Sequence, residues 1–159
     1  MTERPSRASR FTTPPSMDYS KVPPNEVSLE ENVLGAIMLE SECLEDVLLI
    51  LKPEAFYKLE HQFIFSAICD LHTESNPIDI SSVTVKLKSK GLLEKCGGAF
   101  SISKLTDRIA GGANAEYHAR IIQQKFIARE LIRVSGDIYH EAFDETTDVL
   151  ELLDKANLT

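Results

Sequence analysis

Histidines and acidic residues are the side chains of this sequence that could transfer protons or bind a metal ion. The four histidines are scattered and show none of the spacings of a metal site: His61, His72, His118 and His140. His61 follows Glu60 and has aromatic neighbours, which indicates a hydrogen-bonded packing residue rather than a ligand or base. The acidic cluster of Glu42, Glu45 and Asp46 is typical of a solvated helix face. We therefore expect no catalytic residue and no metal site.

Glycine-rich phosphate loops and paired cysteines are also missing. Neither Gly97-Gly98 nor Gly111-Gly112 is followed by the Lys-Ser/Thr that a phosphate-binding loop needs. The three cysteines are odd in number and lack C-x-x-C spacing, which predicts free thiols in a reducing compartment: Cys43, Cys69 and Cys96. No apolar run approaches ~20 residues, and the N-terminus has no hydrophobic signal core. A cytoplasmic protein without membrane contact and without a cofactor is expected.

The distribution of charge favours a protein partner over nucleic acid. The chain carries a net charge of −8; residues 1–27 hold three acidic and four basic residues, which leaves −9 for residues 28–159. Phosphate binding needs clustered Lys and Arg, so an acidic body is a poor sole binder of nucleic acid. Residues 1–27 also hold five of the seven prolines. We expect residues 1–22 to form a disordered arm.

One long helix organises the expected fold. Residues 114–143 contain no proline and carry apolar residues at helical spacing throughout. The broad apolar face of this helix consists of Tyr117, Ile121, Ile127, Ala128, Leu131, Ile132, Val134, Ile138, Tyr139 and Ala142. A narrower apolar strip lies opposite, only in the first half of the helix, and consists of Ala115, Ala119, Ile122 and Phe126.

A helix that is apolar on two sides needs cover on both. Thirty helical residues run for roughly 45 Å, whereas a globule of about 100 residues has a radius of gyration near 13 Å. We therefore expect the helix to project beyond its domain, to pack on its own chain and to offer a surface to another molecule. The alternative is a long core helix with one loosely covered patch.

Shorter helices are expected on both sides of the long one. Ser28 and Glu31 form an S-x-x-E capping box, Gly35 in the same helix indicates close contact with another helix, and Asp79 is placed to cap the next strong helix. The expected shorter elements start at Ser28 and continue with Cys43–Leu51, a single turn at Pro53–Phe56, Lys58–Thr73, Ile80–Lys90, Phe100–Ile109 and a last helix from Val149.

These elements predict an all-α fold in three parts. Residues 1–22 are the arm, residues 23–112 a compact helical head, and residues 113–159 the long helix with a helical hairpin. The apolar pattern of the last helix is still running at Thr159. We therefore expect the chain to be truncated within that helix.

Five segments together resemble the N-terminal domain of bacterial replicative DNA helicases of the DnaB family. They are SLEENVLGAIML, FYKLEHQFIFSAI, PID, LKSKGLLEKCGG and NAEYHARIIQQKFIARELI. Their order and spacing match the family from Pro23 to about Ala156. Each segment alone is a weak signal, and the series carries the resemblance.

The resemblance implies an all-α head followed by a helical hairpin. In such helicases hairpins of neighbouring subunits pair, and six N-terminal domains form a collar above an ATPase ring. Primase docks on the collar, and a helicase loader acts on the same assembly in some bacteria. The resemblance places the subunit contact on Ile122 and Phe126, with Arg129 beside them, and on Leu150 and Leu153. The family's ATPase motifs are absent, so ATP, Mg²⁺ and most DNA contacts are expected in a missing C-terminal domain.

The sequence therefore predicts an oligomerisation and primase-docking domain of a helicase that unwinds duplex DNA at the replication fork. Dimers to hexamers are expected through the hairpin, and no catalysis is expected in this fragment. The alternative is a small helix-turn-helix-like nucleic-acid-binding domain built on the expected helix Ile80–Lys90. Lys86, Lys88 and Lys90 would supply its basic patch. An enzyme in its own right lacks any catalytic constellation.

Overall fold

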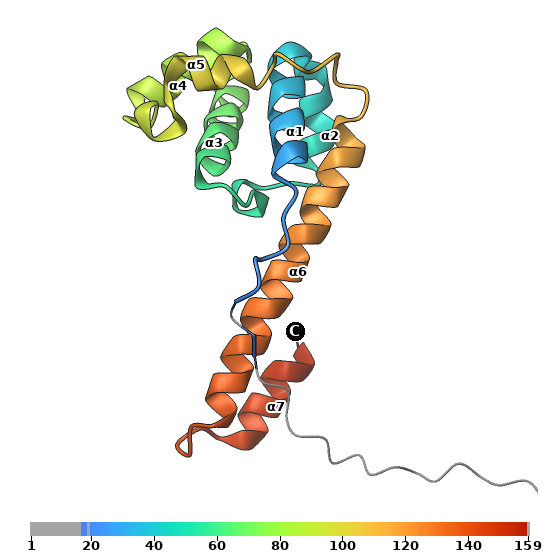
Figure 1. Ribbon diagram of the computed structural model, residues 1–159, viewed down its shortest axis with the longest axis vertical. Coiled ribbons are helices and arrows are strands. Elements are labelled where there is room, and N and C mark those ends of the chain that lie inside the picture. Colours follow the sequence, from blue (N-terminus) through green and yellow to red (C-terminus); the bar gives the residue numbers. More distant parts are fainter. Residues whose placement is uncertain (1–16, 19, 159) are drawn as a thin grey trace, which may run out of the picture.

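A computed structural model describes residues 17–18 and 20–158, and every regular element in that part of the chain is helical (Figure 1). The all-α prediction is confirmed. The α-helices are α1 (Val27–Leu39), α2 (Leu44–Leu48), α3 (Leu59–Thr73), α4 (Ile80–Ser89), α5 (Gly98–Lys104), α6 (Ala115–Ala142) and α7 (Val149–Leu158). Short 3₁₀ helices lie between them: η1 (Ser41–Cys43), η2 (Pro53–Ala55) and η3 (Glu94–Cys96).

Helix α1 lies at the centre of the head and packs against both α3 and α6. Its residues from Val33 to Met38 are all buried, because neighbours cover it on several sides. A Cβ added to Gly35 would lie 2.0 Å from the carbonyl oxygen of Leu105. Gly35 therefore does allow a close contact, but its partner is the turn after α5 rather than another helix: the missing side chain lets this turn approach the backbone of α1.

Helix α6 begins in the head and continues well beyond it (Figure 1). At 28 residues it is roughly 42 Å long. Its first turns pack on α1 and α2, and α7 folds back against its far end. Leu152 is the buried residue of α7. The side chain of Asp148 accepts a hydrogen bond from the amide of Leu150 at 2.8 Å, so Asp148 caps the start of α7.

Several local predictions differ from the structure. Helix α1 begins at Val27, without a side-chain cap, so the predicted capping box at Ser28 is wrong. The helix expected at Cys43–Leu51 is shortened to α2, and the one expected at Phe100–Ile109 is replaced by α5 and the turns after it. The capping prediction at Asp79 is confirmed, since its side chain accepts from the amide of Ser82 in a capping box.

The N-terminal strap, residues 17–18 and 20–26, runs beside α6 from the start of α1 toward the hairpin (Figure 1). Of the arm expected to be disordered, residues 1–16 and residue 19 lie outside the described residues. The end of the chain at Thr159 also lies outside them.

Candidate protein-interaction surface

The narrow apolar strip of α6 faces the head of its own chain. Ala115, Ala119 and Ile122 are buried, and Phe126 packs partly buried against the same core. The side chain of Ile122 is 1% exposed. The expectation that Ile122 is offered to a neighbouring subunit is therefore corrected. Its side chain fills the interior next to α1, because small residues at 115 and 119 let the two helices approach closely.

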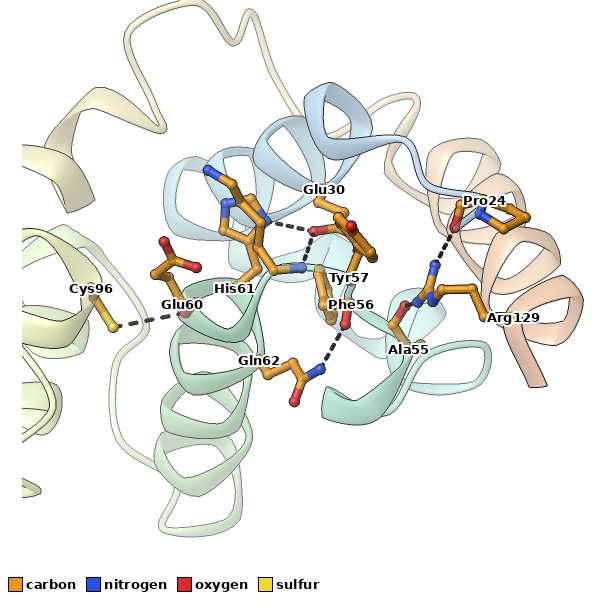
Figure 2. A network of polar contacts seen from close by, with 11 residues as sticks. Pro24, Glu30, Ala55, Phe56, Tyr57, Glu60, His61, Gln62, Cys96 and Arg129 are labelled. Carbon is orange, nitrogen blue, oxygen red and sulfur yellow. Dashed lines mark hydrogen bonds and ion pairs between the residues drawn. The ribbon is translucent and has the colours of Figure 1, made fainter. Parts of the chain in front are cut away.

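Arg129 is occupied within its own chain as well. Its Nη1 donates to the carbonyl of Pro24 at 2.8 Å, and its Nη2 donates to the carbonyl of Ala55 at 2.7 Å. Its guanidinium also lies over two aromatic rings, 5.5 Å from the centroid of Tyr57 and 5.8 Å from that of Phe126. Figure 2 shows the side chain reaching from α6 to both carbonyls. A subunit contact of Arg129 stays a prediction, and this internal role is established beside it.

A buried carboxylate supports the segment on which Arg129 rests. Glu30 of α1 is 1% exposed and accepts from the amide of Tyr57 at 2.6 Å and from that of Lys58 at 3.4 Å. Its other partner is Nδ1 of His61, 2.6 Å away (Figure 2). His61 is thus the hydrogen-bonded packing residue that its neighbours predicted. Glu30 itself gave no sequence signal beyond an acidic residue at an inward position of a helix.

The exposed apolar surface of α6 is its broad face, together with α7. We define the hairpin surface as the exposed large apolar residues of this region: Ile127, Leu131, Ile132, Phe143, Val149, Leu150, Leu153 and Leu158. Leu150 is 73% exposed and Leu153 56% exposed. These two predicted contact residues are accessible, whereas Ile122 is not. The helical periodicity had marked Leu131 and Ile132 as apolar but did not say that they face outward.

The alternative function, binding of nucleic acid through α4, has little available positive charge to support it. Lys86 pairs with Glu74 of the chain after α3 at 2.5 Å, and Lys90 pairs with Asp70 of α3. Two of the three lysines of the expected basic patch are therefore compensated by carboxylates. The exposed Lys88 is on the same helix. Salt-bridged lysines are less available to release counterions on a phosphate backbone.

The thiols and histidines of the described residues do not gather into a reactive centre. Burial raises the pKa of Cys43 and of Cys96, and it raises the pKa of Cys69 to about 11. These thiols therefore stay protonated near neutral pH, unlike a nucleophilic cysteine. Among the described residues, no group of three His, Cys, Asp or Glu side chains is arranged to hold a metal ion. In the same part of the chain, no helix has the length and hydropathy to cross a bilayer.

Comparison with known proteins gives consistent matches over this domain. The family model of the DnaB-like helicase N terminal domain matches residues 22–124. The replicative DNA helicase DnaB of Rhodothermus marinus is 44% identical over 135 residues, which cover 85% of this chain and 14% of that helicase. The corresponding helicase of Geobacillus stearothermophilus is 36% identical over 137 residues, 86% of this chain and 30% of the relative. The chain thus spans only a small part of these relatives.

A solved structure has the same fold. The crystal structure of the N-terminal domain of DnaB helicase from Mycobacterium tuberculosis aligns with a TM-score of 0.81 at 33% identity. The alignment covers 86% of this chain and 96% of that chain. The similarity therefore extends over nearly all of the helical elements described above.

Proposed function

Because the chain belongs to the DnaB-like helicase N-terminal domain family, we propose that it is the oligomerisation and primase-docking domain of a replicative helicase. The hairpin surface joins copies of the domain, and the assembled heads receive the primase. Unwinding of duplex DNA, with ATP and Mg²⁺, belongs in this proposal to the rest of the helicase. A helicase loader is a further possible partner of the same assembly.

The exposure of the hairpin surface is the observation that supports self-association. Single exposed apolar side chains are normal on monomers, and the head has some, such as Leu49 and Val85. On the hairpin, seven large apolar side chains that are half or more exposed lie on or between the adjacent helices α6 and α7. Burial of such surface contributes ~25 cal/mol per Å² before the cost of association. A second copy of the same hairpin offers matching apolar residues, as a two-fold interface requires.

Primase docking is supported by the family and by charge. The body of the chain is acidic, and complementary charge speeds the encounter with a partner and limits wrong partners. Self-association through the hairpin would leave the head free for this second contact. The measurement is the mass of the complex formed with the C-terminal region of the primase from the same organism.

The experiment for self-association is sedimentation equilibrium of the double variant Leu150→Ser and Leu153→Ser. Both side chains are exposed, so far-UV circular dichroism should stay helical while the mass falls to that of the 17.7 kDa monomer. The matched control is Leu49→Ser with Val85→Ser, two exposed apolar residues of the head. The control should keep the mass of the unaltered chain.

Two results would contradict the self-association proposal. The unaltered chain could sediment as a monomer at the highest concentration reached, or the hairpin double variant could keep the mass of the unaltered chain. If the primase fragment fails to bind an assembled domain, only the docking part of the proposal is lost.

A further inference from the structure

Beyond the head, α6 packs against few segments other than α7. Its contacts with the head come from α1, α2 and η2, which pack near its first half. The strap is the segment that continues along α6 beyond these contacts (Figure 1). It borders a groove of about 950 Å³ that is also lined by α6 from Phe126 to His140 and by head residues between Glu54 and Gln62. The strap therefore spans the region between the head and the hairpin.

Arg129 ties this strap to the head and to α6 at one point. Its guanidinium is held by α6 and donates to Pro24 of the strap and to Ala55 of η2. These two carbonyls come from segments far apart in the sequence, and the planar fork of donors of one arginine side chain serves both. The same guanidinium lies over the rings of Tyr57 and Phe126.

Two further observations place the strap beside α6. Nearer the head, Lys125 Nζ lies 3.7 Å from a carboxylate oxygen of Glu26. Farther out, Met17 and Gly136 line the same groove, and a Cβ added to Gly136 would have room beside Sδ of Met17, at 3.9 Å. The strap therefore lies beside α6 on both sides of Arg129, over about three helical turns.

We propose that Arg129 and the N-terminal strap form a brace that fixes the direction in which the hairpin leaves the head. Arg129 is a positioning residue in this brace. The role in assembly rests on the proposed self-association: two hairpins pair well only when each head presents its hairpin in the same direction, so the brace strengthens self-association. Loosening it spreads the hairpin over many directions and adds an ordering cost to each contact.

The test measures the distance between the head and the hairpin tip in the full chain. Spin labels on unnatural amino acids at Ser89 and Glu145, both exposed, avoid the native thiols, and pulsed electron paramagnetic resonance gives the distance distribution. Arg129→Gln should broaden the distribution, and Arg129→Lys should leave it intermediate. The matched control is Arg120→Gln, an exposed arginine of the same helix that lies outside the groove and pairs with Glu116, and it should change nothing.

Self-association is measured on the same variants. Arg129→Gln should weaken it at least about fivefold, the lower end of typical couplings between sites. If Arg129→Gln does not fold, deletion of residues 1–24 removes the outer strap and the Pro24 carbonyl without touching the buried core, and it should broaden the distances in the same way.

The outcomes separate the brace from the proposed function. A distance distribution unchanged in both Arg129→Gln and the deletion overturns the brace, whatever the sedimentation result. A chain that never self-associates overturns the proposed function, while the distance distribution still decides the brace. Broadened distances with unchanged self-association overturn the link between the brace and assembly.

Discussion

Replacing Glu30 by alanine should lower the free energy of unfolding far more than replacing an exposed glutamate of the same helix. The carboxylate is buried and accepts from the amide of Tyr57 and from His61, each at 2.6 Å. Alanine would leave both donors without an acceptor at a site where the Glu30 and His61 side chains are almost fully buried. Unsatisfied buried donors cost about 1–3 kcal/mol each, so the loss is roughly 2–6 kcal/mol. We take the middle of this range, about 4 kcal/mol, as the expected loss.

Urea unfolding followed by far-UV circular dichroism measures this loss. With a slope of about 2 kcal/mol per molar urea, the midpoint for Glu30→Ala should fall by about 2 M. Glu31→Ala is the matched control, because Glu31 is the next residue of α1 and is exposed. Its midpoint should change by less than about 0.3 M, since exposed substitutions usually stay within ~0.5 kcal/mol. Equal midpoints for the two variants would refute the role assigned to the buried carboxylate.

Three further changes are expected to have defined effects. Gly35→Ala should lower the free energy of unfolding by about 2 kcal/mol, because its Cβ would collide with the carbonyl of Leu105; a stabilised variant would mean that the segment after α5 moves aside. Ile122→Ala should cost about 2–5 kcal/mol in thermal or urea unfolding, as buried isoleucines do; unchanged stability with lost self-association would restore it as a contact residue. The Cys69 thiol has a folded pKa of about 11, raised mainly by burial from 9.0, so its contribution to stability is present below pH 9 and is lost as the pH rises toward 11. Between pH 9 and 11 the free energy of unfolding of Cys69→Ala should decline less steeply than that of the unaltered chain. Parallel plots of this free energy against pH would contradict the assignment.

Local signals predicted most of the helices. The long helix was expected over residues 114–143 and spans Ala115–Ala142, since an uninterrupted apolar period over many turns has no competing interpretation. The cap at Asp79 was also found, because its partner lies three residues away. Such signals depend on neighbours in the sequence, so helices and their caps can be predicted without knowledge of the tertiary structure.

Signals that depend on distant partners were missed or assigned to the wrong residue. Ser28 and Glu31 matched a capping box, yet the helix begins one residue before Ser28. The carboxylate of that turn that makes tertiary hydrogen bonds is Glu30. Glu30 has this role because it accepts hydrogen bonds from Tyr57 and His61, about thirty residues farther along the chain. Ser28, Glu30 and Glu31 lie in one helical turn, and no rule based on neighbouring residues can say which of them will bind partners about thirty residues away.

The sequence alone determined that the long helix has two apolar sides and that one of them ends halfway. Tertiary structure decided which side is inside. The head places α1 against the narrow strip, where alanines allow close packing, so Ile122 is buried, whereas Leu131 and Ile132 of the broad face stay exposed. Periodicity records where apolar side chains lie around a helix axis, but burial depends on the shape of the surface that another segment brings to it.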